Sequence, residues 1–253
     1  RPQSLHRYPN GIEGKSFFQK DVETHPPWVN TIPIEESGGD LVHYVLCQDE
    51  STLLYLANLG CIELNPWNSR VSALDAPDYF VIDLDPLDIG FSAVIETARA
   101  VRRVLDRAGA PSFPKTSGAT GLHVYVPLAA QYATEQVVQF AKIVAHLVHQ
   151  QLPEITSIER SPERRNKCVY VDYLQNRRGQ TLASAYSLRP RPGAPVSTPL
   201  KWSEVKKGLD PKDHNMRTIF RRLDRFGDLW RPVLGPGIDL EACLDRLGAA
   251  QES

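Results

Sequence analysis

The spacing of hydrophobic and polar residues along the chain predicts alternating strands and helices. Short runs rich in β-branched and aromatic residues are typical of strands. They occupy residues 41–47, 61–65, 78–84, 121–128, 168–173 and 181–188. A helical hydrophobic period occupies residues 50–59, 91–108, 137–152 and 216–226. Asp49 can cap the first of these helices, and Gly60 and Gly109 follow the ends of two of them.

The last part of the chain has a different pattern. Residues 189–199 contain several prolines and Gly193, which is typical of a loop or linker. Residues 200–253 are expected to be mainly helical. The inward-facing residues expected in the helix at 216–226 are Met216, Ile219, Phe220 and Leu223. Because strands and helices mix along the whole chain, we expect an α/β or α+β fold around a central sheet.

Composition places the chain among ordinary globular proteins. Hydrophobic residues make up 42% and charged residues 23% of the 253 residues. No apolar run is long enough for a membrane helix, and residues 1–10 have no apolar signal-peptide core. We therefore expect a cytoplasmic, nucleoid-associated protein without a membrane partner. The four cysteines form no C-x-x-C pair, which predicts reduced thiols rather than a zinc site or disulfides.

Charge is distributed unevenly although the formal net charge is only −1. Residues 40–100 contain ten acidic and two basic residues, whereas residues 160–191 contain eight basic and two acidic residues. A near-neutral total can therefore combine an acidic lobe with a basic one, and the basic lobe is compatible with nucleic-acid binding. Solvated charged faces explain the same pattern without any ligand.

Two aspartates interrupt the hydrophobic strand predicted at residues 78–84. Asp83 and Asp85 are two residues apart, so on a strand they share one face. Two neighbouring carboxylates repel each other, and burial adds to that cost. A divalent cation would remove the conflict, and carboxylate oxygens suit Mg²⁺ or Mn²⁺. The same residues are as compatible with a capping turn that includes Pro86 and Asp88.

A third aspartate strengthens the case for a metal site. Asp172 interrupts a second apolar run, at residues 169–173. If the two strands are neighbours, three carboxylates converge and can hold two metal ions about 3.5–4 Å apart, as phosphoryl transfer requires. One ion would activate an attacking hydroxyl and the other would stabilise a leaving pyrophosphate. The alternative is an aspartate on an edge strand that faces solvent.

Residues 115–123, Lys-Thr-Ser-Gly-Ala-Thr-Gly-Leu-His, can form a phosphate-binding loop. Glycines and hydroxyl residues allow backbone N–H groups to face an anion, and His123 can donate a hydrogen bond to a phosphate oxygen. The segment lacks the Gly-Lys-Ser or Gly-Lys-Thr ending of the common phosphate-loop motif. A tight hairpin is the alternative.

Two further features can contact a nucleotide. Arg189 follows the strand predicted at residues 181–188, where it can clamp a phosphate or simply be exposed. Phe17 and Phe18 are followed by Lys20, and such aromatic side chains can stack on bases. Adjacent phenylalanines are more often part of a core, and we expect at least one of them to be buried.

Taken together, these ordered motifs resemble the polymerase domain of bacterial ligase D, a member of the archaeo-eukaryotic primase superfamily that acts in non-homologous end joining. The motifs lie at residues 7–11, 17–20, 83–86, 115–118, 121–123, 172–176 and 185–189, with Thr198, Pro199 and Trp202 continuing the pattern. Each motif is weak alone, but their order along the chain is highly specific.

The resemblance implies one primase-like polymerase domain over residues 1–253. Its catalytic core would span about residues 1–191 and its helical part about residues 200–253, with a mostly antiparallel central sheet flanked by helices. It implies extension of a primer 3′ end from NTPs or dNTPs, often with a preference for ribonucleotides. Two divalent ions are implied, with Mn²⁺ favoured over Mg²⁺. The implied partners are DNA ends, gapped or primer-template DNA, Ku, and ligase and nuclease domains.

The resemblance also assigns roles to individual residues. Metal binding and catalysis fall to Asp83, Asp85 and Asp172. The implied nucleotide contacts are Ser117, His123, Arg189, Lys20, Asn65 and Gln175, with one of Phe17 and Phe18 stacking on the base. Arg7 and Lys15 can face DNA.

Three departures from the family pattern are visible. Asn65 stands where many relatives have histidine, and Thr120 stands where some have lysine. We expect the N-terminal segment that helps relatives to hold a 5′-phosphate to be absent, and therefore little preference for a 5′-phosphate over a 5′-hydroxyl.

Three other functions remain open on the sequence. A metal nuclease can use the same carboxylates, although it needs no triphosphate pocket. A non-catalytic DNA-end-binding module would be expected to lose at least one of the three aspartates. A primase that starts chains without a primer belongs to the same superfamily.

Overall fold

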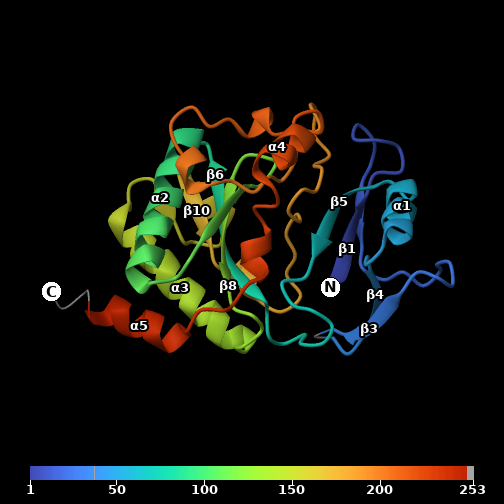
Figure 1. Ribbon diagram of the computed structural model, residues 1–253, viewed down its shortest axis with the longest axis horizontal. Coiled ribbons are helices and arrows are strands. Elements are labelled where there is room, and N and C mark those ends of the chain that lie inside the picture. The colour runs from blue at the N-terminus through green and yellow to red at the C-terminus, as the bar shows by residue number, and fades with distance from the viewer. Residues whose placement is uncertain (37, 250–253) are drawn as a thin grey trace.

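The computed structural model describes residues 1–36 and 38–249, which form two five-stranded sheets (Figure 1). The N-terminal sheet contains β1 (Pro2–Arg7), β2 (Phe17–Gln19), β3 (Thr31–Glu35), β4 (Leu41–Leu46) and β5 (Cys61–Pro66). Its order is β2-β1-β4-β3, and β5 also pairs with β1. The second sheet contains β6 (Tyr79–Leu87), β7 (Phe113–Thr116), β8 (Leu122–Pro127), β9 (Thr156–Ser157) and β10 (Cys168–Asp172), in the order β7-β8-β6-β10-β9. Pairing is antiparallel except between β9 and β10.

The helices belong mainly to the second half of the chain. The α-helices are α1 (Glu50–Asn58), α2 (Phe91–Ala108), α3 (Thr134–Gln151), α4 (Ile219–Phe226) and α5 (Leu240–Ala249). Single 3₁₀ turns are η1 (Pro162–Arg164), η2 (Leu174–Asn176), η3 (Trp202–Glu204), η4 (Pro211–Asp213) and η5 (Arg231–Leu234). This mixture confirms the expected α/β (α+β) class with antiparallel sheets.

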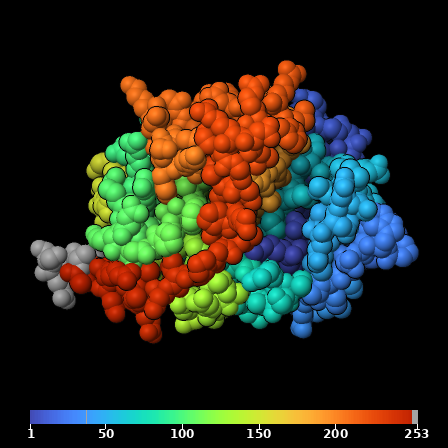
Figure 2. Space-filling view, in the orientation of Figure 1, coloured from blue at the N-terminus to red at the C-terminus, as the bar shows by residue number. Residues whose placement is uncertain are grey.

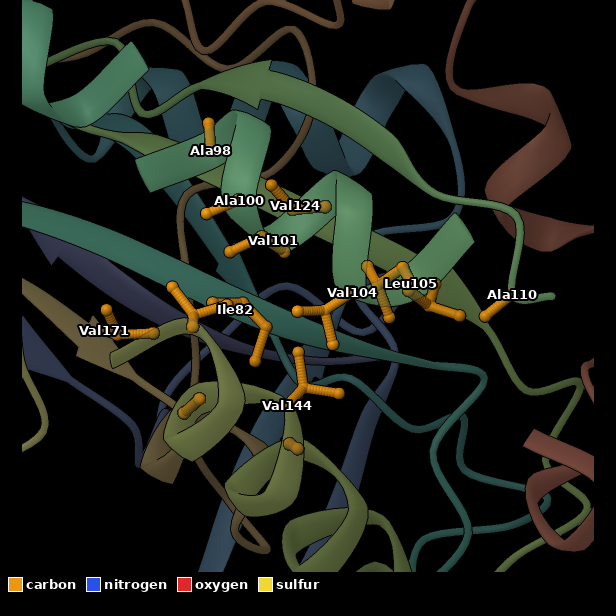
Figure 3. Packing of buried hydrophobic residues seen from close by; sticks show 14 of the residues in the cluster. Ile82, Ala98, Ala100, Val101, Val104, Leu105, Ala110, Val124, Val144 and Val171 are labelled. Carbon is orange, nitrogen blue, oxygen red and sulfur yellow. The ribbon is translucent and has the colours of Figure 1, made fainter. Parts of the chain in front are cut away.

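Helices α2 and α3 cover one face of the second sheet and leave the other face for polar residues (Figures 1 and 3). Along β6, Phe80, Ile82 and Leu84 point into the core formed with these helices. Because successive strand residues alternate between faces, the residues between them point to the opposite side. Val81 joins a smaller aromatic cluster there, and Asp83 lies on the same face. The helix-covered core therefore fixes the aspartates on the open face of the sheet.

The ends of the long elements follow the predicted signals. Asp49 caps α1, its side chain accepting a hydrogen bond from the Thr52 amide at 2.7 Å. Helix α2 ends at Gly109, whose φ of 72° lies in the left-handed region that favours glycine. Five of the six predicted strands, β4, β5, β6, β8 and β10, and the four predicted helices, α1 to α4, lie within a few residues of their predicted bounds.

A connecting segment, residues 181–199, runs between the two sheets (Figure 1). At one end the Ser184 amide donates to the Leu64 carbonyl of β5 at 2.9 Å. At the other end the Thr116 amide of β7 donates to the Thr198 carbonyl at 2.9 Å. In Figure 2 the part of the chain after residue 199, coloured orange, lies across the middle of the molecule, between its green and blue parts. The segment therefore ties the two sheets together through backbone hydrogen bonds.

Several expectations are wrong. The strand predicted at 181–188 is irregular, with isolated bridges at Thr181 and Leu188. Its backbone bonds partly to Leu64 of β5 and partly to residues 196–197 of the same segment, rather than to one neighbouring strand. Of the residues expected to face inward at 216–226, Ile219 is buried and Leu223 is half-buried. Phe220 is 68% exposed, because the short helix α4 presents only a narrow face to the core, and Met216, which precedes α4, is 50% exposed. Strands β1, β2, β3, β7 and β9 were not predicted.

Two smaller expectations can be compared directly. Cys47, Cys61, Cys168 and Cys243 are free thiols, as expected. Within the part of the chain that the structure describes, no helix is both long enough and apolar enough to span a bilayer.

Candidate active site

The three aspartates meet on the open face of the second sheet. Asp83 and Asp85 lie on β6, and the antiparallel register places Asp172 of β10 directly opposite Asp83. Asp83 and Asp172 are only 3% and 8% exposed, whereas Asp85 lies at the exposed end of the group. The predicted convergence of the two strands is confirmed by this register.

Burial and mutual repulsion keep these carboxylates from ionising easily. Burial, followed by the charges of Asp85 and Asp172, raises the pKa of Asp83 well above its usual value. Desolvation and then Asp172 raise the pKa of Asp85. Burial also raises the pKa of Asp172, although a hydrogen bond from the Leu174 amide opposes it. The group therefore favours a positively charged ligand, which would let all three carboxylates ionise.

The hydrogen bonds differ between the two buried aspartates. Asp172 accepts from the Leu174 amide at 2.7 Å and from Gln175 Nε2 at 3.2 Å. Asp83 Oδ1 has no hydrogen-bond partner, although it is fully buried and His123 Nε2 lies 3.2 Å away. An orphaned buried carboxylate oxygen is costly, and a divalent cation is a suitable partner for it.

The donor set therefore fits a hard divalent cation by its chemistry. Among residues 1–36 and 38–249, however, no three His, Cys, Asp or Glu side chains are already arranged as a metal site. Asp172 is held by its own hydrogen bonds, and Asp83 is turned towards His123. Binding would thus require the carboxylate side chains to reorient.

A row of residues crosses the sheet beside the aspartates. His123 of β8 is opposite Asp83, and Lys115 of β7 is opposite His123. Burial, followed by the charges of Lys115 and Arg189, lowers the pKa of His123 well below its usual value, so the ring is neutral. The sequence had not assigned a role to Lys115, which is fully buried with Nζ near the Tyr125 ring. No local signal marks this lysine, because the strand that holds it, β7, was not predicted.

The loop between β7 and β8 is the tight hairpin that the sequence left as an alternative. Ser117 Oγ accepts hydrogen bonds from the amides of Ala119 and Gly121, both at 3.0 Å. A Cβ at Gly121 would lie 2.2 Å from the Leu84 carbonyl oxygen, so only glycine fits this close approach. The Ser117 hydroxyl therefore shapes the turn beside the carboxylates.

Arg189 reaches this turn from the connecting segment. Its Nη1 donates to the Ser117 carbonyl, and its Nε donates to Glu63 Oε2 at 2.7 Å. Gly118, with a φ of +73°, leaves room for the arginine, because a Cβ there would lie 2.6 Å from Arg189 Cγ. Glu63 was not predicted as a site residue, since its partner is 126 residues away in the sequence.

The N-terminal sheet contributes an aromatic surface. Phe17 and Phe18 are 45% and 62% exposed, so the expectation that one of them is buried is wrong. Short strand β2 lies at the edge of its sheet, where both side chains stay at the surface. His6 stacks on Phe18 at a ring distance of 4.1 Å, and the Arg7 guanidinium lies 5.2 Å from the Phe17 ring.

The remaining predicted residues divide into two groups. Asn65 is buried beside Glu63, with Nδ2 3.4 Å from Oε1, and Gln175 is bonded to Asp172. Lys20 pairs with Glu36 at 3.0 Å, and Lys15 is exposed before β2. Gln175 thus joins the aspartates and Asn65 joins Glu63 on β5, whereas the two lysines contact neither group.

A cavity of about 470 Å³ opens beside the aspartates. Asp85, Asp172 and Gln175 line one part of it. Its basic residues are Arg160, Arg165 and Arg177. Positive charge thus borders the carboxylates on the side where a polyanion can approach.

A family profile and two curated relatives match this chain, and all three are LigD proteins or their polymerase domain. Residues 1–230 match the profile of the LigD primase-polymerase domain. A multifunctional non-homologous end joining protein LigD of Pseudomonas aeruginosa is 34% identical over 253 residues, covering 97% of this chain and 30% of that protein. A bifunctional LigD of Bacillus subtilis is 34% identical, covering 90% of this chain and 37% of that protein. The chain thus spans about a third of the curated relatives it matches.

A solved structure is also similar. The polymerase domain from Mycobacterium tuberculosis ligase D in complex with DNA superposes with a TM-score of 0.86 and 28% identity, covering 94% of this chain and 86% of that one. The similarity therefore extends to almost the whole described fold.

Proposed function

The chain belongs to the LigD primase-polymerase domain family and is a nucleotidyltransferase, and from this premise we propose that it extends a primer 3′ end during the repair of DNA ends. The observation that carries the proposal is the opposition of Asp83 and Asp172 across paired strands, with Asp85 beside them. Such a carboxylate group is the common feature of sites that transfer nucleotidyl groups.

Asp83, Asp85 and Asp172 would hold two divalent cations, Mn²⁺ or Mg²⁺. When bound, these ions would neutralise the carboxylates and the negative charge that develops on attacking and leaving oxygens. The orphaned oxygen of Asp83 and the raised pKa values of the three carboxyl groups support this assignment.

The other residues would bind the nucleoside triphosphate. The neutral ring of His123 can donate one hydrogen bond to a phosphate oxygen, and Arg189 can add a charge-assisted one. Phe18 is exposed enough for a base to stack on its ring. Ser117 would contribute through the turn that it shapes. Ribonucleotide preference belongs to this proposal by family membership.

DNA would approach along the cavity bordered by Arg160, Arg165 and Arg177. The related Mycobacterium tuberculosis domain is described in complex with DNA, which supports DNA as the polymer here. Gapped and primer-template DNA are the proposed substrates, and Ku, ligase and nuclease domains are proposed partners. A metal nuclease is the second candidate, favoured only by the carboxylates themselves.

Primer extension tests the proposal. A labelled primer-template with a 5′-phosphate in the gap is incubated with rNTPs or dNTPs and Mn²⁺ or Mg²⁺. We expect extension by the wild type and a loss of at least about a hundredfold in D83N, D85N and D172N, because each removes charge from the site. D88N is the matched control, since Asp88 is exposed in the turn after β6.

Two outcomes would contradict the proposal. Substantial extension by any of the three variants would remove that carboxylate from the catalytic group. Shortening of the primer by the wild type without nucleotides would instead support the nuclease.

A further inference from the structure

Glu63 on β5 is a buried carboxylate with a partner on each oxygen. Oε1 lies 2.8 Å from His6 Nδ1, and Oε2 accepts from Arg189 Nε at 2.7 Å. The residue as a whole is only 5% exposed to solvent. Both partners come from other parts of the chain: His6 lies on β1, and Arg189 lies in the connecting segment. Because His6 is the neighbour of Glu63 across the β1–β5 pair, the bond to Arg189 is the one that links the N-terminal sheet to the connecting segment.

The contacts continue in both directions. On one side His6 stacks on exposed Phe18, with ring centroids 4.1 Å apart and planes 17° apart. On the other side Arg189 Nη1 donates to the Ser117 carbonyl in the turn beside the aspartates. A continuous path thus runs from an aromatic surface on the N-terminal sheet to the carboxylate side of the second sheet.

The carboxylate of Glu63 is ionised. Burial acts to raise its pKa, but the positive charge of Arg189 and the hydrogen bond from His6 outweigh that effect and lower it. An anion so close to a phosphate-binding arginine has two opposing consequences. It offsets part of the arginine charge, which weakens attraction to a triphosphate, and it holds a flexible side chain in one geometry, which strengthens that attraction.

The geometry of Arg189 favours the second consequence. Nε and Nη1 are both engaged, whereas Nη2 has no protein acceptor among the residues that the structure describes. A guanidinium group is planar, so fixing two of its nitrogens fixes the direction of the third. Glu63 and the Ser117 carbonyl therefore leave one oriented donor for a ligand.

We propose that Glu63 is a positioning residue that orients Arg189 Nη2 for the triphosphate. The proposal rests on the proposed function, because it assigns the triphosphate to Arg189. Glu63 itself does not contact the nucleotide, and its effect on the nucleotide passes through Arg189.

A double-mutant cycle tests this role. The variants are E63Q, E63A, R189A and E63A/R189A, measured by primer extension at varied NTP concentration and by titration of DNA alone. We expect E63A to raise KM for the NTP about tenfold, with kcat and DNA affinity nearly unchanged, because a correctly placed charge-assisted hydrogen bond is lost. E63Q should lie between E63A and the wild type, since its carbonyl oxygen still accepts one hydrogen bond.

Non-additivity is the decisive readout. If Glu63 acts through Arg189, E63A/R189A should be no worse than R189A alone. E23A is the matched control, because Glu23 is an exposed glutamate in the connection between β2 and β3, and it should behave as the wild type. A lower KM in E63Q would show that Glu63 only neutralises the arginine, and additive losses would show that it does not act through Arg189. Either result overturns the proposal.

Nucleotide binding without turnover separates this proposal from the proposed function. Calorimetric titration of ATP in the presence of Mn²⁺ reports affinity even if no primer is extended. Wild type that binds ATP but extends no primer would contradict the polymerase assignment while leaving the cycle measurable by binding. Thermal unfolding of E63Q, the nearly isosteric variant, controls for misfolding, and equal ATP affinity in folded E63Q, E63A and wild type would overturn the role of Glu63.

Discussion

Asp83 combines burial with two acidic neighbours. Its carboxylate lies inside the sheet face, opposite Asp172 and two residues from Asp85. Each effect alone raises a carboxyl pKa, and together they raise that of Asp83 well above its usual value. The protein without metal is therefore less stable than it would be with a neutral side chain at this position.

The pH dependence of the thermal stability of D83N tests this destabilisation by Asp83. An acid whose pKa is higher in the folded than in the unfolded state binds more protons when folded, so stability falls as pH rises from about 4, the unfolded value. In EDTA, D83N should have a higher unfolding temperature than the wild type, and the difference should grow as pH rises through this window. About 1 kcal/mol of relief corresponds to about 2–4 °C at this chain size.

Thermal unfolding between pH 4 and 8 provides the measurement, with D88N as the control at an exposed aspartate. A lower unfolding temperature for D83N at pH 8 would mean that the carboxylate stabilises the metal-free fold. Addition of Mn²⁺ should raise the unfolding temperature of the wild type more than that of D83N.

The sequence predicts some site residues much better than others. Asp83 and Asp85 follow from strand periodicity, because polar residues inside an apolar run are visible locally. Glu63 and Lys115 could not be predicted in this way. Their environment is created by partners far away in the sequence, Arg189 for Glu63 and Ser197 for Lys115.

Among the elements, the turn between β7 and β8 links backbone geometry most directly to the site. Ser117 Oγ accepts two amide hydrogen bonds within the turn, which fixes its path. Gly121 then passes close to the backbone of β6, next to Asp85. The position of this turn relative to the carboxylates thus depends on a residue without a side chain.

G121A should disturb this arrangement. Its Cβ would lie 2.2 Å from the Leu84 carbonyl oxygen and 3.4 Å from Asp85 Oδ1, so the turn must shift away from β6. Overpacking of this kind costs about 1–3 kcal/mol, and we expect a loss of primer extension larger than the loss of stability would explain.

Chemical unfolding and extension assays on the same preparation measure both effects. G248A is the matched control, because a Cβ at Gly248 in α5 meets nothing within 4 Å and should be neutral or stabilising by up to about 1 kcal/mol. Full activity and unchanged stability in G121A would show that the turn tolerates a side chain.

Elements with strong periodicity were predicted well, and those with mixed composition were not. Helix α2 has buried residues throughout the predicted face, and its glycine stop is where it was expected. Strand β1 was missed because Gln3 and Ser4 are polar yet buried between neighbouring strands. Its position depends on pairing with β2, β4 and β5, which no local pattern reveals.

At the scale of the whole molecule, the connecting segment and the charge distribution bring the two halves together around the site. Backbone hydrogen bonds from the segment reach β5 at Leu64 and β7 at Thr116. The basic stretch at residues 160–191 then supplies arginines to the cavity next to the carboxylates. A chain of net charge −1 can therefore present a local positive surface to DNA.

R160Q tests whether this surface binds DNA. Arg160 is exposed and lines the cavity beside Asp85 and Asp172, where its charge can neutralise a backbone phosphate. Loss of one such contact should weaken binding of all DNA sequences alike and reduce the slope of log affinity against log salt by about 0.9.

R103Q is the control, because Arg103 is exposed on α2, which covers the opposite face of the sheet. Fluorescence titrations of a gapped duplex at several salt concentrations would measure both slopes. Equal slopes in R160Q, R103Q and wild type would place the DNA on another surface, and a reduced slope in R103Q alone would place it on the helical face.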